Sequence, residues 1–190
     1  MPPFTYSTAL LAGGKSKRMG RDKTLLPIKN SELLLWQRQW QLLEKFRPKE
    51  MFWSGPPRAG TPSQALIVDD VVEDAGPLSG ICASLERMHT DLLIVLAIDL
   101  PEMHPAIFLN LLKQCRKRCG AVYQNEKFFE PLAAIYPKSL HLLAAEHLAQ
   151  GRYAMQDFIR EAIKREMMVS LPLPEAGLIH FKNVNTPSDL

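Results

Sequence analysis

Residues 92–98 form an uninterrupted apolar run, LLIVLAI, which ends at Asp99. A strand with one wet face alternates apolar and polar residues, whereas a strand that is buried on both faces shows no alternation. Strands of the second kind occur in parallel sheets that helices cover on both sides, so the run predicts the central strand of such a sheet. Asp99 then lies at the carboxyl end of that strand.

Segments typical of strands alternate with segments typical of helices along the rest of the chain. This order favours a three-layer α/β/α sandwich with a mostly parallel central sheet, as a single domain over residues 1–190. The helices are indicated by apolar residues that recur every three or four positions, as at Met155, Phe158 and Ile159. We expect strands at 8–12, 51–53, 66–68, 92–98, 167–171 and 178–184, and helices at 32–46, 78–89, 105–118, 139–150 and 155–165.

The composition narrows the class of protein. Of 190 residues, 46% are hydrophobic and 23% are charged, which suits a globular domain with a full core. The formal net charge of +3 is too small for the broad basic surface of a nucleic-acid-binding domain. No apolar run approaches the ~20 residues of a membrane span, and residues 1–7 lack the pattern of a signal peptide. We therefore expect a cytoplasmic protein that binds neither nucleic acid nor a membrane.

The cysteines and histidines show no pattern of a metal centre or of a catalytic thiol. Three cysteines cannot all pair with each other, and their spacing fits no zinc site, so a reduced cytosolic chain is the simplest interpretation. Each cysteine continues an apolar stripe of a predicted helix, so we expect Cys82, Cys115 and Cys119 in the core. His147 also falls on the apolar side of its predicted helix, which indicates a buried structural residue.

A glycine-rich, basic loop follows the first predicted strand, where residues 11–23 read LAGGKSKRMGRDK. Glycine lets the backbone approach an anion closely, backbone amides can point at phosphate oxygens, and lysine and arginine neutralise them. Two familiar phosphate motifs are excluded, because a P-loop needs glycine where Ala9 stands and no G-x-G-x-x-G is present. The alternative to a phosphate site is a glycine-rich turn followed by a run of charged side chains that are exposed to solvent. Open α/β sheets, however, bind ligands at this edge, so the loop predicts a site for nucleotide phosphates.

Carboxylates follow two of the predicted strands. Asp99 ends the central strand and should face the same crevice as the basic loop, where one carboxylate and substrate phosphates are enough to hold Mg²⁺. On its own, an aspartate after a strand is more often a cap or turn residue. Asp69 and Asp70 follow another strand, where a carboxylate can accept hydrogen bonds from the N–H groups of a base such as guanine. An acidic loop before a helix N-terminus is the alternative for residues 69–74.

Five short segments, spread over essentially the whole chain, form one ordered set of motifs. They are LAGGKSKRMGRDKTLLP at 11–27, DAGPLSGI at 74–81, LAIDLPEM at 96–103, EPLAAIY at 130–136 and NVNTPSDL at 183–190. In this order they resemble the molybdenum cofactor guanylyltransferase family. That family belongs to the nucleotidyltransferases of the glycosyltransferase-A type, with a Rossmann-like fold similar to nucleotide-diphospho-sugar transferases. The resemblance implies transfer of GMP from GTP to molybdenum-molybdopterin, with release of pyrophosphate and with Mg²⁺ as cofactor.

The resemblance also implies roles for individual residues. Arg18 and Lys23 would hold the triphosphate and act in catalysis together with Asp99, which would bind both Mg²⁺ and the nucleotide. Asp70 would lie near the base, or Asp69 if the loop carries an insertion. The residues that would line the nucleotide pocket are Leu11, Ala12, Gly13 and Gly14.

Three positions depart from the family pattern. Ile98 stands where cysteine is frequent, Glu102 where an apolar residue is usual, and Ser54 where asparagine is common. These departures bear on base selectivity and on the acceptor more than on phosphate chemistry. The alternatives are therefore a related enzyme that uses CTP or a sugar-phosphate acceptor, and a non-catalytic nucleotide-binding module. By resemblance, Asn183 and Asn185 would contact acceptor or metal, and proteins that deliver or receive the cofactor would make transient contacts.

Overall fold

A computed structural model describes residues 4–13 and 33–184 of the chain. Its centre is a seven-stranded sheet in the order β3-β2-β1-β4-β6-β5-β7, in which β6 is antiparallel to both its neighbours and all other pairs are parallel. The elements are β1 (Tyr6–Leu11), α1 (Leu35–Glu44), β2 (Met51–Ser54), β3 (Leu66–Val68), α2 (Pro77–Arg87), β4 (Leu92–Ala97), α3 (Pro105–Gln114), β5 (Gly120–Gln124), β6 (Ala133–Pro137), η2 (Lys138–Leu140), α4 (His141–Ala149), α5 (Met155–Lys164), β7 (Met168–Pro172) and η3 (Glu175–Phe181).

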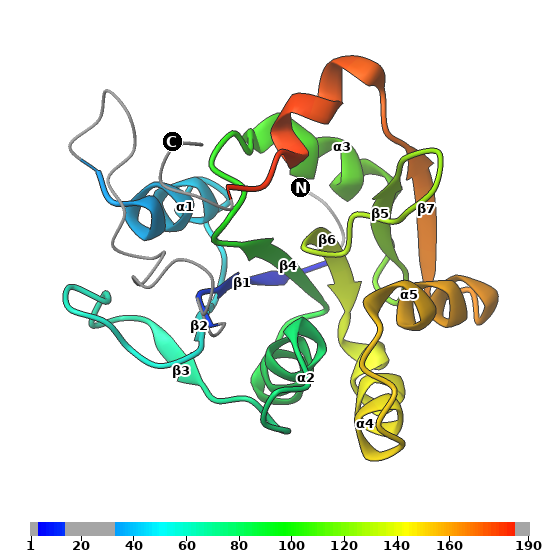
Figure 1. The fold of residues 1–190 in the computed structure, drawn as a ribbon, viewed down its shortest axis with the longest axis horizontal. Coiled ribbons are helices and arrows are strands. Elements are labelled where there is room, and N and C mark those ends of the chain that lie inside the picture. Colours follow the sequence, from blue (N-terminus) through cyan, green and yellow to red (C-terminus); the bar gives the residue numbers. More distant parts are fainter. Residues whose placement is uncertain (1–3, 14–32, 185–190) are drawn as a thin grey trace.

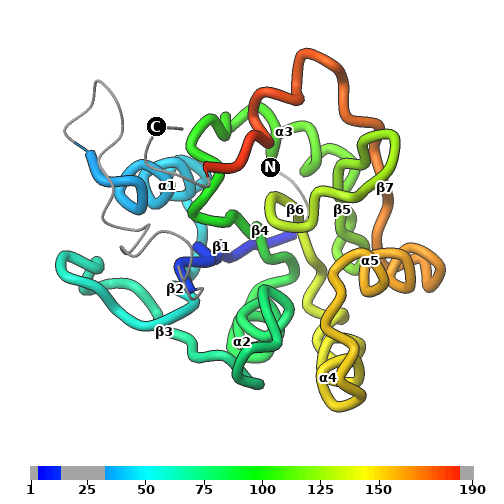
Figure 2. Tube along the Cα trace, viewed as in Figure 1, coloured from blue at the N-terminus to red at the C-terminus, as the bar shows by residue number. Residues whose placement is uncertain are grey.

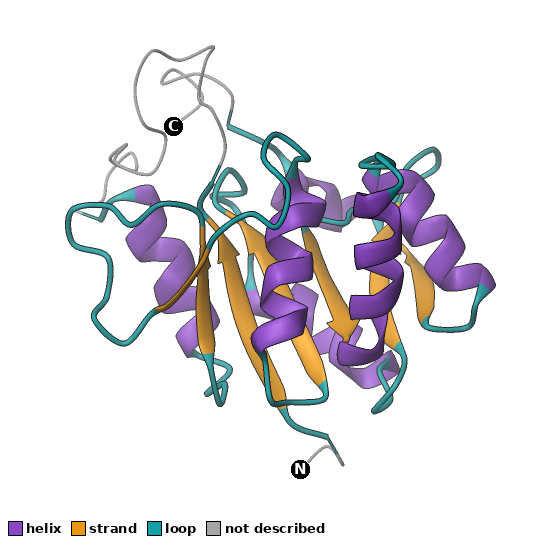
Figure 3. Cartoon of the chain, turned by 90° about the horizontal axis from the view of Figure 1, so that it is seen from below, coloured by secondary structure: helices purple, strands orange, loops and turns teal. Residues whose placement is uncertain are grey.

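Helices cover both faces of the sheet. In Figure 1, α1 and α3 lie on one side of the strands, and α2, α4 and α5 lie on the other. Figure 3, turned by a right angle, shows helices in front of and behind the strands. The predicted three-layer α/β/α sandwich with a mostly parallel sheet is therefore confirmed. Among the described helices, none is both long enough and apolar enough to cross a membrane.

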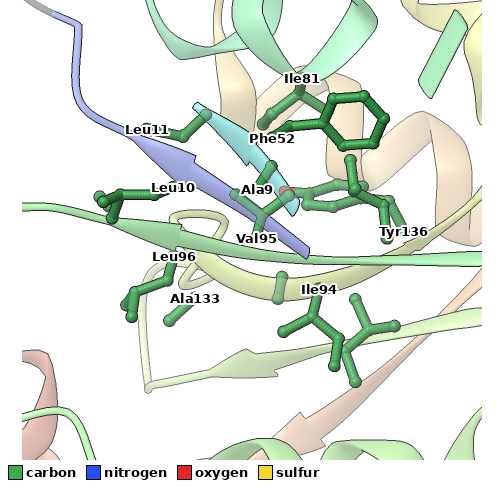
Figure 4. Packing of buried hydrophobic residues seen from close by; sticks show 14 of the residues in the cluster. Ala9, Leu10, Leu11, Phe52, Ile81, Ile94, Val95, Leu96, Ala133 and Tyr136 are labelled. Carbon is green, nitrogen blue, oxygen red and sulfur yellow. The ribbon is translucent and has the colours of Figure 1, made fainter. Parts of the chain in front are cut away.

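The middle of the sheet is buried on both faces. Every residue of β4 is buried, and β4 pairs along its whole length with β1, so that Leu10 lies opposite Leu96. In Figure 4 these two side chains point to one face of the sheet, while Phe52 and Ile81 meet on the other. Burying one such side chain contributes about 1.5–3 kcal/mol relative to leaving it exposed. The uninterrupted apolar run is thus the central strand, as predicted.

One predicted strand is wrong, and two strands were not predicted. The strand expected at 178–184 is wrong, because residues 175–181 form the 3₁₀ helix η3. Pro172 ends β7 and Pro174 precedes η3, and neither residue has the backbone N–H that a sheet ladder needs. Conversely, β5 and β6 were not predicted. Both are five-residue runs that are almost wholly buried, and such short apolar runs carry no periodicity that identifies a strand.

The cysteines and His147 have structural positions. Cys82 and Cys115 are buried as predicted, and burial raises the pKa of these thiols to about 11 and about 12, so both stay protonated at neutral pH. Cys119 is half-buried and lies beyond the end of α3, so the prediction of a core position is wrong there. His147 is buried, and its Nε2 lies 2.8 Å from Glu161 Oε2, which joins α4 to α5. Its predicted place in the core is confirmed.

Candidate active site

Strands β1 and β4 run side by side and end at the same edge of the sheet. Leu11, the last residue of β1, lies opposite Ala97, the last residue of β4. The pairing continues one step further, because Ile98 N donates to Leu11 O at 3.2 Å. Asp99 follows directly and is half-buried. In Figure 3 this edge is the upper one. The fold thus brings together the end of the first strand, with Ala12 and Gly13, and the carboxylate of Asp99.

Two glycines let the backbones that follow β1 and β2 cross closely. Ala12 N donates to Ser54 O at 2.9 Å, and the next residues on each chain are Gly13 and Gly55. A Cβ built on Gly55 would lie 2.6 Å from Gly13 Cα, and Gly55 has φ +114°. Both observations require glycine at position 55. The backbone at Gly13, where the predicted phosphate loop begins, is therefore fixed by the connection between β2 and β3.

Asp70 follows β3 and reaches the first turns of α2. A Cβ built on Gly80 would lie 2.0 Å from Ser54 Oγ and 3.5 Å from Asp70 Oδ1, so these three residues converge. Desolvation raises the pKa of the Asp70 carboxyl, and the charges of Asp69 and Asp74 add to the effect. Of the two aspartates that the sequence left open, Asp70 is the one at this contact. Its carboxylate can accept hydrogen bonds from N–H donors of a ligand.

Gly80→Ala is expected to destabilise the protein, because the new methyl group would overlap Ser54 Oγ. Overpacking of this kind costs about 1–3 kcal/mol. Urea denaturation would measure the change in the free energy of unfolding. Adding Ser54→Ala removes the overlapping oxygen but leaves the Cβ of residue 54 at 3.1 Å from the new methyl group, so the double variant should recover part of the lost stability. An equal loss in the single and double variants would contradict this packing.

Residues 180–184, at the end of the described chain, contact the loop that carries Asp99 and Glu102. Val184 N donates to Asp99 O at 2.9 Å, and His180 Nδ1 lies 2.6 Å from Glu102 O. In Figure 2 this segment, drawn in red, passes α3 and comes back to the loop after β4. Asn183, which the resemblance assigned to acceptor or metal, is next to the first of these bonds.

Several predicted site residues lie outside the described residues: Gly14, Arg18, Lys23 and Asn185. Within residues 4–13 and 33–184, no group of three or more His, Cys, Asp and Glu side chains forms a metal centre. Mg²⁺, however, usually takes one or two protein carboxylates and completes its shell with water and substrate phosphates. The half-buried carboxylate of Asp99, at the ligand-binding edge, fits that chemistry.

Glu130 also lies at this edge, although no residue pattern had assigned it a role. It precedes β6, whose amino end meets the edge because β6 is antiparallel to β4. Leu96 pairs with Ala133, and Ala97 N donates to Leu132 O at 2.8 Å. A turn at residues 131–132, in which Ala133 N donates to Glu130 O at 3.4 Å, joins Glu130 to this end of β6.

Sequence comparison places the chain among nucleotidyltransferases. The family model of the MobA-like NTP transferase domain matches residues 8–166. A protein of Opitutus terrae named probable molybdenum cofactor guanylyltransferase is 36% identical over 186 residues, which are 95% of this chain and 91% of that protein. A molybdenum cofactor guanylyltransferase of Syntrophotalea carbinolica is 31% identical over 157 residues, which are 81% of this chain and 73% of that protein.

Solved structures share the fold. Molybdopterin-guanine dinucleotide biosynthesis protein A of Archaeoglobus fulgidus matches with a TM-score of 0.74 and 25% identity, over 96% of this chain and 94% of that one. The 2-C-methyl-D-erythritol 4-phosphate cytidylyltransferase of Thermus thermophilus matches with a TM-score of 0.67, over 95% of this chain and 93% of that one. At 14% identity, the second match shows the fold alone. The chain thus belongs to the family of MobA-like NTP transferase domains and is a nucleotidyltransferase.

Proposed function

We propose that the protein transfers GMP from GTP to molybdenum-molybdopterin and releases pyrophosphate. One observation carries the proposal: the parallel strands β1 and β4 end side by side, which sets the start of the glycine-rich loop next to Asp99. Open α/β sheets bind their ligands at this edge. The names of the relatives, which match most of the chain, support GTP and the molybdenum cofactor as substrates.

The proposed reaction is an in-line attack by a phosphate oxygen of the acceptor on the α-phosphorus of GTP. A new P–O bond forms as the bond to the bridging oxygen breaks, and its electron pair leaves with pyrophosphate. Such transfers depend on positioning and on stabilisation of charge, so no protein nucleophile is required. Leu11, Ala12, Gly13 and Gly14 are proposed to line the nucleotide pocket, and Asp70 to lie near the base.

The charged groups of the proposed site neutralise phosphates. Arg18 and Lys23 are proposed to hold the triphosphate and to stabilise pyrophosphate as it leaves. Nucleotidyltransferases of this family generally use a divalent metal ion. We propose Mg²⁺ held by Asp99; when bound, it would withdraw charge from the phosphate oxygens. Transient contacts with proteins that deliver the acceptor or receive the product are part of the same proposal.

A nucleotide panel tests which base the site prefers. In the presence of Mg²⁺, GTP is expected to raise the melting temperature more than CTP, ATP or UTP. A ligand at 100 times its dissociation constant stabilises the folded state by about 2.7 kcal/mol, which a thermal-shift assay resolves. Incubation with molybdopterin and each triphosphate, followed by identification of the dinucleotide, then tests the reaction. A cytosine dinucleotide would favour the CTP alternative, and nucleotide binding without pyrophosphate release would favour a binding module.

A further inference from the structure

Glu130 is held in the turn between β5 and β6. Its backbone N donates to Tyr123 O at 2.8 Å, and its side-chain Oε1 accepts a hydrogen bond from Asn125 Nδ2 at 2.9 Å. Asn125 is itself fixed, because its Oδ1 accepts from the backbone N of Lys127 at 3.0 Å and of Phe128 at 2.8 Å. The orientation of the carboxylate is therefore set by the turn.

The carboxylate of Glu130 has no cationic partner among the described residues. It is half-buried, and its hydrogen bond with Asn125 uses Oε1, which leaves Oε2 available. Burial raises the pKa of this carboxyl, and the hydrogen bond from Asn125 opposes the rise. A partly desolvated carboxylate without a cation lowers stability unless it meets further donors. Groups of this kind gather at functional sites, where a ligand supplies the donors.

Asp70 and Glu130 lie on opposite sides of Asp99 in the sheet. Asp70 follows β3, an outer strand, and Asp99 follows β4 in the middle. Glu130 precedes β6, the next strand on the far side of β4. If the reacting α-phosphorus lies near Asp99, the nucleotide base and the acceptor extend from it in different directions. The sheet thus offers one carboxylate for each of the two molecules that the reaction joins.

Guanine and the pterin of the acceptor, the two heterocycles of the proposed reaction, have the same hydrogen-bonding edge. Guanine and a pterin each carry a ring N–H next to an exocyclic amino group, and the two oxygens of a carboxylate can accept both hydrogen bonds. Asp70 lies on the side assigned to the base, which leaves Glu130 for the other ring. We infer that Glu130 is a specificity-determining residue that binds the N–H and amino groups of the acceptor's pterin, and that Asn125 is its positioning residue. This inference rests on the proposed function.

Glu130→Gln tests the inference. The amide keeps the size of the side chain and a carbonyl oxygen for Asn125, but it replaces one acceptor oxygen by a donor that faces the donors of the pterin. The KM for molybdopterin is expected to rise about 10- to 100-fold, the usual effect of losing hydrogen bonds to a charged group. The KM for GTP and the Mg²⁺ concentration for half-maximal rate should stay unchanged. Glu126→Gln, the same charge change at an exposed position of the same turn, should behave as wild type.

Asn125→Asp provides a second variant. The aspartate keeps an oxygen for the backbone N–H groups of Lys127 and Phe128, but it loses the donor to Glu130 and sets a like charge beside it. The KM for molybdopterin should therefore rise again. In the double variant with Glu130→Gln the rise should be no larger than in Glu130→Gln alone, because a positioning residue acts only through its partner. Additive effects would overturn the positioning role.

The outcomes separate the inference from the proposed function. If wild-type protein forms no dinucleotide from GTP and molybdopterin, the proposed function is overturned and the inference falls with it. If wild-type protein forms the product and Glu130→Gln has an unchanged KM for molybdopterin, the inference alone is overturned. A raised KM for GTP, or a raised Mg²⁺ requirement, would assign Glu130 to the nucleotide instead and would also overturn it. Equal melting temperatures of Glu130→Gln and Glu126→Gln would show that the fold is intact.

Discussion

Asp99→Ala is expected to lower the rate of GMP transfer by about one to three orders of magnitude while the protein stays folded. A charge pair at ~4 Å is worth about 1–4 kcal/mol between the dielectric of water and that of a protein surface, and each 1.4 kcal/mol changes a rate about tenfold. The fold should survive because the bond from Val184 N goes to the backbone O of Asp99, which alanine retains. Pyrophosphate release, followed as Mg²⁺ is titrated, would measure the loss.

Two further variants sharpen this prediction. Asp99→Asn keeps the shape of the side chain and removes its charge, so it should lose nearly as much activity as Asp99→Ala. Glu102→Gln removes a charge three residues further on, where the contact with His180 uses only the backbone O of Glu102, and it should keep its activity. Wild-type rates in either Asp99 variant would overturn the role of this carboxylate.

Gly55→Ala is expected to be the most damaging of the small substitutions. The methyl group would lie 2.6 Å from Gly13 Cα, and alanine would have to adopt φ +114°. Backbone strain of this kind costs about 1–3 kcal/mol, and the overlap with backbone atoms adds to it. The free energy of unfolding, measured with urea, should fall by more than about 2 kcal/mol. The KM for GTP should rise as well, because Gly13 begins the loop proposed to hold the nucleotide.

Gly151→Ala is the matched control for this prediction. Gly151 also has a positive φ of +69°, but nothing lies within 4 Å of a Cβ built on it. It follows α4, and no atom of Gly13 lies within 4 Å of the built Cβ. The control therefore bears only the backbone strain and should leave the KM for GTP unchanged. If Gly55→Ala is no more destabilising than Gly151→Ala, the close crossing at Gly13 is not what requires glycine at position 55.

The fold was predictable where burial leaves a clear mark on the sequence. The run at 92–98 has no polar residue, and only a central strand or a buried helix can hide such a run; its length favours a strand. Three elements beyond β4 were not recognised, namely β5, β6 and η3. β6 is a buried run of five residues and is antiparallel to its neighbours, and η3 places Leu178 and Ile179 on the surface, where they are about half exposed. In the sequence, these two apolar residues looked like the start of a buried strand, although they are exposed in the fold.

The candidate site was predictable on the side where strands are parallel. The rule that ligands bind at the carboxyl ends of parallel strands pointed to Leu11 and Asp99, and both lie at one edge. The same rule passes over Glu130, because it stands at the amino end of an antiparallel strand. The crossing of Gly13 and Gly55 was hidden for another reason. It depends on the register between β1 and β2, which no local pattern contains.

The hydrogen bond from Val184 to Asp99 has a consequence for protein synthesis. Ribosomes add about 5–20 residues per second and domains begin to fold from their N-terminal side, so Val184 joins the nascent chain several seconds after Asp99. During that interval β1 and β4 can already pair, while the loop that carries Asp99 still lacks its tether. A nascent chain can therefore gain a folded centre before the loop of Asp99, the proposed metal ligand, is tethered, and we expect activity only after translation has passed residue 184.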